Sequence, residues 1–139
     1  MSNTRFNRPV DSELKFMASA ALTPGGDGNT ADATGVAITS ISGGDGVVEV
    51  IFNVSAAAGT IDSSNYVEVE LQVSADDSTY YGVSESKVKV TETGAIVVAV
   101  ERKSIDELVA DVAYFRVTAT QTGTTATAVT LDAYFAPSK

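Results

Sequence analysis

Carboxylates are the side chains of this sequence that could carry out acid–base chemistry. The 139-residue chain has 18 Asp and Glu residues but no His, Cys or Trp, which excludes thiol nucleophiles, Ser-His pairs and His or Cys metal sites. Glu68 and Glu70 would share one face of a strand, and a glycosidase requires two nearby carboxylates. Because no Trp can hold a sugar ring beside them, a solvated charged face fits better. We predict no enzymatic activity and no catalytic residue.

Oxygen-bearing side chains also cluster in two turns. Asp27, Asn29 and Asp32 follow one another at short spacing in and after a Gly-rich stretch, and Asp76 and Asp77 are adjacent at a second turn. Calcium binds about six to eight oxygen ligands, and neither turn supplies that number locally. We therefore predict no metal ion and no cofactor, with a structural Ca2+ at either turn as the alternative.

The second of these turns is also a candidate ligand loop. Asp76, Asp77, Tyr80 and Tyr81 combine carboxylates with amphipathic rings, which are typical of ligand sites and protein interfaces. One ring could equally fill the core while the other covers a sheet edge. Both interpretations stay open at this point.

Short strands must position these residues. In residues 65–74, apolar side chains alternate with polar ones, a period of two that predicts a half-buried strand. Runs rich in Val and Ile at 46–54 and 94–101 favour strands in the middle of a sheet. Further strands are predicted at 16–22, 36–41, 79–83, 87–91, 112–120 and 125–135. A capping box from Ser104 to Glu107 predicts one helical turn over 104–108.

These elements predict one all-β domain over residues 15–139. It would be an antiparallel β-sandwich of about eight strands, either jelly-roll or immunoglobulin-like, with one short helical turn. Residues 118–130 are rich in Thr and almost uncharged. A neutral face of this kind attracts another strand when it stands at an edge, so we predict that it pairs with a neighbouring subunit or docks on a larger surface.

Residues 1–14 are predicted to form an extended arm, because they are polar, contain Pro9 and show no helical or strand period. Residues 1–15 are the basic exception in a chain with a net charge of −9, because they hold Arg5, Arg8 and Lys15 against Asp11 and Glu13. That charge argues against nucleic acid, and no apolar run suits a membrane span. We expect Arg5, Phe6 and Arg8 to contact a partner, the ring as an apolar anchor and the arginines on carboxylates.

Two segments carry a resemblance to a known family. They read VELQVSADDSTYYGV at 69–83 and YFRVTATQTGTTATAVTLDAYF at 114–135. A strand ending at Ser74, the acidic turn, Tyr80, the later strand with Arg116 and the Thr-rich hairpin resemble a small β-sandwich of tailed-bacteriophage structural proteins. That family includes capsid decoration (cement) proteins.

The resemblance implies a structural protein that binds the outer capsid surface and reinforces it. It implies the major capsid protein as partner, a homo-oligomer in the form of a trimer, and a location on the virion exterior after synthesis in the host cytoplasm. A similar hairpin occurs in discoidin-like carbohydrate-binding sandwiches, although this chain lacks their Trp and Cys residues. A sugar-binding module that uses the loop from Asp76 to Tyr81, or a tail or baseplate component, are the alternatives.

Overall fold

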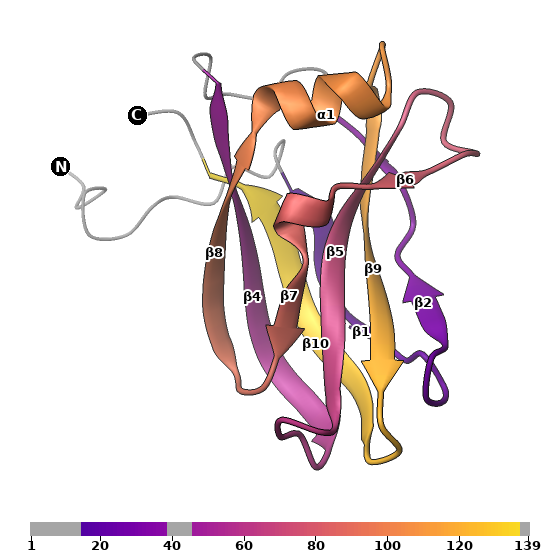
Figure 1. The fold of residues 1–139 in the computed structure, drawn as a ribbon, viewed down its shortest axis with the longest axis vertical. Helices are drawn as coiled ribbons and strands as arrows, with labels where there is room; N and C mark the ends of the chain where they lie inside the picture. Colours follow the sequence, from indigo (N-terminus) through magenta and orange to yellow (C-terminus); the bar gives the residue numbers. More distant parts are fainter. Residues whose placement is uncertain (1–14, 39–45, 137–139) are drawn as a thin grey trace, which may run out of the picture.

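Two antiparallel β-sheets pack face to face in the computed structural model, which describes residues 15–38 and 46–136 (Figure 1). The predicted all-β sandwich is therefore confirmed, while the predicted arm lies outside the described residues. One sheet contains, in spatial order, β1 (Lys15–Leu22), β10 (Ala126–Phe135), β4 (Val47–Gly59) and β8 (Gly94–Glu101). The other contains β9 (Tyr114–Thr122) and β5 (Tyr66–Ser74), flanked by β2 (Thr30–Asp32), β3 (Val36–Ala37), β6 (Tyr81–Gly82) and β7 (Val88–Val90).

The strands follow one another as a long hairpin rolled around the sandwich. β2 and β3 share one position beside β9, and β6 and β7 share one beside β5, so the described strands fill eight positions. Along the chain, the first position pairs with the eighth, the second with the seventh, the third with the sixth and the fourth with the fifth. This nested pairing is the jelly-roll connection, one of the two that the sequence left open.

The core lies between the two sheets and is filled by the alternation along each strand. In β5, the apolar positions of the period-two pattern are all fully buried: Val67, Val69, Leu71 and Val73. Phe16, Phe115 and Phe135 come from three different strands and meet in the interior, with ring centroids 4.9–6.3 Å apart. This aromatic cluster joins the two sheets, because β9 belongs to one sheet and β1 and β10 to the other.

The single described α-helix, α1 (Arg102–Leu108), begins two residues earlier than predicted. Its N-cap is Glu101, which makes no side-chain cap bond, and Ser104 lies inside the helix, so the predicted capping box is wrong. The backbone N–H of Arg102 instead donates to the carbonyl of Gly46 over 2.6 Å. The start of α1 is thus fixed against the chain entering β4. No helix in residues 15–38 and 46–136 is long and apolar enough to cross a membrane.

The sheet order limits one prediction and contradicts another. The Thr-rich strands β9 and β10 each have neighbours on both sides, so they do not pair with a neighbouring subunit along an open edge, while docking of residues 118–130 on a larger surface stays a prediction. Residues 94–101, predicted in the middle of a sheet, form the edge strand β8. The apolar composition of β8 misled the prediction because part of it faces outward: the side chain of Val97 is 55% exposed.

Candidate functional site

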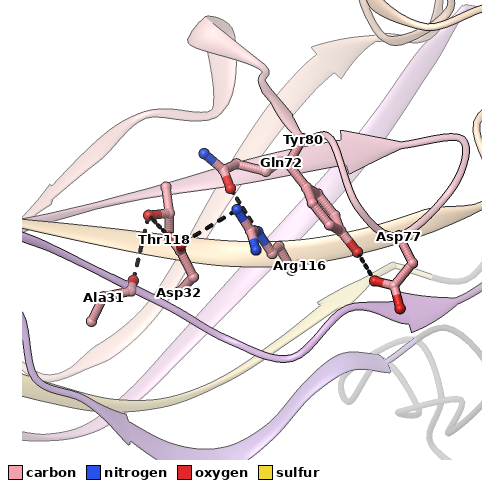
Figure 2. A network of polar contacts seen from close by, with 7 residues as sticks. All are labelled: Ala31, Asp32, Gln72, Asp77, Tyr80, Arg116 and Thr118. Atoms are coloured by element: carbon pink, nitrogen blue, oxygen red, sulfur yellow. Dashed lines mark hydrogen bonds and ion pairs between the residues drawn. The ribbon is translucent and has the colours of Figure 1, made fainter.

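Arg116 is the centre of a polar cluster on the outer face of the six-stranded sheet (Figure 2). Its Nε donates to Oε1 of Gln72 over 2.7 Å, and its Nη2 lies 3.3 Å from Oδ2 of Asp32. Its guanidinium carbon also lies 3.9 Å from the centre of the Tyr80 ring. A planar guanidinium suits this combination, because its edge donates hydrogen bonds while its face stacks on a ring.

Strand register explains why these side chains meet. Gln72 of β5 pairs with Arg116 of β9, and Asp32 of β2 pairs with Thr118, two residues further along β9. Directly paired residues project to the same face of an antiparallel sheet. The Thr118 hydroxyl donates to Oδ1 of Asp32 over 2.6 Å, so both oxygens of that carboxylate are bound. The cluster therefore fastens the three-residue edge strand β2 to the sheet.

Tyr80 extends the cluster into the loop between β5 and β6. Its hydroxyl donates to Oδ1 of Asp77, a residue with a positive φ of 61° (Figure 2). Burial, and after it the Asp77 carboxylate, raise the pKa of the Tyr80 hydroxyl above its ordinary range. A Cβ at Gly35 would collide with the hydroxyl of Tyr80 and the carboxylate of Asp77, so the backbone after β2 lies against this loop.

Asp76 holds the same loop in shape from within. Its Oδ1 accepts the backbone N–H groups of Ser78 and Thr79 over 2.9 and 3.0 Å, and the hydroxyl of Ser74 over 3.0 Å. These bonds, that of Thr79 first, lower the pKa of the Asp76 carboxyl because they favour its charged form.

We expect Asp76→Ala to reduce the acid sensitivity of the fold. A carboxyl with a lowered pKa contributes stability above about pH 4 and loses it as the pH falls through the folded-state pKa. Urea unfolding of the variant between neutral and acid pH should therefore show a lower midpoint near neutral pH and a shallower decline in acid. Asp111→Ala, at an exposed position after α1, changes the net charge equally and serves as the control. Equal acid declines for wild type and Asp76→Ala would contradict the assignment.

The four residues of the predicted ligand loop do not all face the same way in the structure. Asp76 and Asp77 bind groups of the loop itself, and Tyr80 turns toward Arg116. Tyr81 is 46% exposed and lines a shallow hollow together with Asp76, Thr79 and Leu108. Asp76 and Tyr81 thus share one hollow, while Asp77 and Tyr80 belong to the Arg116 cluster.

The structure also separates Asp27 from Asp32, two of the three oxygen-bearing residues of the first turn. Oδ1 of Asp27 accepts the backbone N–H of Gly123 over 2.7 Å, whereas Asp32 belongs to the Arg116 cluster.

A hollow of about 310 Å³ beside α1 is lined by Glu85, Glu101 and Glu107 among other residues. In the described part of the chain, no group of three or more Asp, Glu, His or Cys residues could hold a metal ion.

Glu68 and Glu70 share the outer face of β5, as their spacing predicted. The pKa of Glu70 is raised, mainly by burial. The negative charge of Glu68 raises it further, whereas the positive charge of Lys87 lowers it. A Cβ at Gly82 would collide with the Glu70 carboxylate, so that carboxylate lies against the backbone of β6. Glu68 pairs in register with Lys89 of β7, whose Nζ lies 4.7 Å from the centre of the Tyr66 ring.

Arg116 is a site residue that the sequence alone does not single out. The predicted contact residues Arg5, Phe6 and Arg8 lie outside the described residues. The available signal was the outward position of Arg116 in the alternation of β9, which placed the guanidinium on a polar face. Its partners come from strands far away in the chain and could not be identified without the sheet order.

Fold and site together define a jelly-roll sandwich with a polar cluster around Arg116 on one outer face. Comparisons with family models, with curated proteins and with solved structures found no match to this chain.

Proposed function

We propose that this chain is a non-enzymatic structural protein of a virus particle, which binds the outer capsid surface and reinforces it. The position of the arm, at the end opposite a set of acidic loops, supports this function. β1 begins at Lys15, so segment 1–14 joins the sandwich at the end where α1 lies (Figure 1). The loops at the opposite end are 23–29, 60–65, 91–93 and 123–125, all described, and they contain Asp27, Asp62 and Glu92 but no Lys or Arg.

Attachment by the arm would leave these acidic loops outermost. Arg5 and Arg8 can pair with carboxylates of a partner surface, while the acidic loops at the far end would repel other particles of the same kind. The jelly roll supports the proposal at the level of fold, since viral capsid domains use it, although lectin domains use it too.

The arm supplies the contacts in this proposal. Arg5 and Arg8 would bind carboxylates of the major capsid protein, and Phe6 would enter an apolar pocket between them. The family resemblance adds a trimer on the virion exterior, in which three arms bind together. Several weak arms attached to one assembly bind far more tightly than one arm alone.

Deleting residues 2–13 should abolish attachment to capsids and leave the domain folded. The domain should stay folded because the deletion ends before Lys15, the first residue of β1. Sedimentation of the protein with purified capsids of its source particle measures attachment, and circular dichroism checks the fold. Arg5→Glu and Arg8→Glu should each weaken attachment by about tenfold or more, because a charge-assisted bond contributes roughly 1.5–3 kcal/mol.

Asn3→Ala and Asn7→Ala provide matched controls in the same arm, because they leave its charge and its ring unchanged. They should bind capsids nearly as the wild type does. Unchanged attachment after deletion of the arm would overturn its role. Failure of the intact, folded protein to bind capsids would overturn the proposed function itself.

The sugar-binding alternative receives less support from the geometry. One face of the Tyr80 ring is covered by Arg116, and the carboxylates of Asp76 and Asp77 accept hydrogen bonds inside the loop. Sugar sites use exposed ring faces and free polar groups. Binding to a glycan array that is lost in Tyr81→Ala, the exposed ring of the pair, would favour this alternative instead.

A further inference from the structure

Strand β8 forms one edge of the four-stranded sheet. Among the described residues, β4 is the one strand that pairs with it (Figure 1). All eight residues of β8 pair with β4 in unbroken register, from Gly94 opposite Val54 to Glu101 opposite Val47. A regular edge of this length presents a row of backbone N–H and C=O groups, which is a template for another strand.

The other edges of the described sandwich carry the usual protections against such pairing. β1 has two register shifts and begins at Lys15. β2 and β3 contain only three and two residues, and β6 and β7 only two and three, with Lys89 in β7. Short strands, bulges and lysines block edge-to-edge contact. The sequence of β8, GAIVVAVE, has no Lys and no Pro.

The side chains of β8 are incompletely covered. On the outer face, Ala95, Val97 and Ala99 are exposed, Val97 to 55%. Ile96 and Val98, which point toward the core, are only half-buried. A strand added at this edge would cover apolar surface on both faces of the sheet.

We propose that β8 pairs with β8 of a second copy, antiparallel, about a two-fold axis at Val97. In this register Val97 lies opposite its own counterpart, Ala95 opposite Ala99, and Ile96 opposite Val98. Each pair then projects to one face, as antiparallel pairing requires. The two four-stranded sheets would become one continuous sheet through an isologous contact.

Charge complementarity supports a second copy as the occupant. With a net charge of −9, two copies repel unless they meet where charge is absent or opposite. No charged residue lies between Glu92 and Glu101, so the centre of the contact is neutral. At both ends of the contact, the turn of one copy that contains Glu92 comes near the start of α1 of the other, where Arg102 lies. Arg102 also pairs with Asp106 at 3.8 Å in its own helix.

Single cysteines test the register, because the chain contains no Cys of its own. Val97→Cys should form a disulfide-linked dimer on mild oxidation, since the axis places the two sulfurs opposite each other. Ala95→Cys should cross-link far less, because its counterpart would lie opposite Ala99. Equal cross-linking of the two variants, or preferential cross-linking of Ala95→Cys, would overturn the register.

Matched lysine variants test the edge itself by sedimentation velocity at high micromolar concentration. The wild type should be a dimer, and Val97→Lys a folded monomer. Val47→Lys alters a valine of similar exposure, 54%, on β4 rather than on the free edge, and should remain dimeric. A monomeric wild type would overturn the proposal, and so would the trimer implied by the family resemblance, because a two-fold contact does not close a ring of three. Equal loss of the dimer in both variants would also overturn it. None of these readouts depends on capsid attachment.

Discussion

Replacing Phe115 with Ala is expected to destabilise the domain by roughly 3–5 kcal/mol. The Phe115 side chain is 1% exposed, and its ring lies 5.0 Å from that of Phe135 in an edge-to-face arrangement and 6.3 Å from that of Phe16. The substitution removes a large buried apolar surface and leaves a cavity between the two sheets. Because domains are stable by only about 5–15 kcal/mol, the urea unfolding midpoint should fall by about a fifth or more.

Phe115→Leu is the control for this prediction, because it keeps most of the apolar volume and should cost much less than the alanine variant. A double-mutant cycle with Phe135→Ala should reveal a coupling of about 0.5–1.5 kcal/mol from the ring pair. A loss below about 1 kcal/mol for Phe115→Ala would contradict the aromatic cluster that joins the sheets.

The class of fold follows from local pattern, which is why the sequence predicts it well. The alternation in residues 65–74 places the valines and Leu71 inside and the glutamates outside, as the structure shows for β5. Any register shift by one residue would reverse those faces, so the pattern specifies the strand strongly. β2, by contrast, contains only Thr30–Asp32, and three residues are too few to display a period.

The order of strands in the sheets could not be predicted in the same way. The run of Val and Ile in β8 resembles that in β4, yet β4 lies inside its sheet and β8 at its edge. Composition reports how apolar a strand is, whereas its place depends on connections between distant parts of the chain. The Thr-rich segment 118–130 gives the converse case, since it belongs to β9 and β10, which both lie inside their sheets.

The polar cluster depends on this long-range order. Arg116 meets Gln72 across 44 positions and Asp32 across 84 positions of the chain, and both contacts follow from strand register. The alternation places Arg116 on an outer face but cannot name its partners. The capping role of Asp76 is different, because all its partners lie within three residues and an acidic turn already indicates it.

Ser86→Ala is expected to destabilise the domain by roughly 1–3 kcal/mol, although it removes a single oxygen atom. Ser86 ends the 3₁₀ turn η2 (Ser84–Ser86) and is fully buried. β6 and β7 lie one after the other along the same side of β5, and η2 separates them. Leu71 therefore has no strand partner on that side among the described residues. The backbone carbonyl of Leu71 accepts the N–H of Val83 over 2.9 Å, and the backbone N–H of Leu71 donates to Oγ of Ser86 over 2.8 Å.

The Ser86 hydroxyl thus replaces a missing strand, and it also donates to the Val83 carbonyl over 2.6 Å. Without it, the N–H of Leu71 is buried with no acceptor, which costs the full desolvation of that group. Urea unfolding measures the loss, and hydrogen exchange of the Leu71 amide locates it, because that amide should exchange faster relative to its neighbours in β5. Ser84→Ala, exposed in the same turn, should change stability by less than about 0.5 kcal/mol. If Ser86→Ala leaves both the unfolding midpoint and the exchange of Leu71 unchanged, the hydroxyl is not what completes β5 at this point.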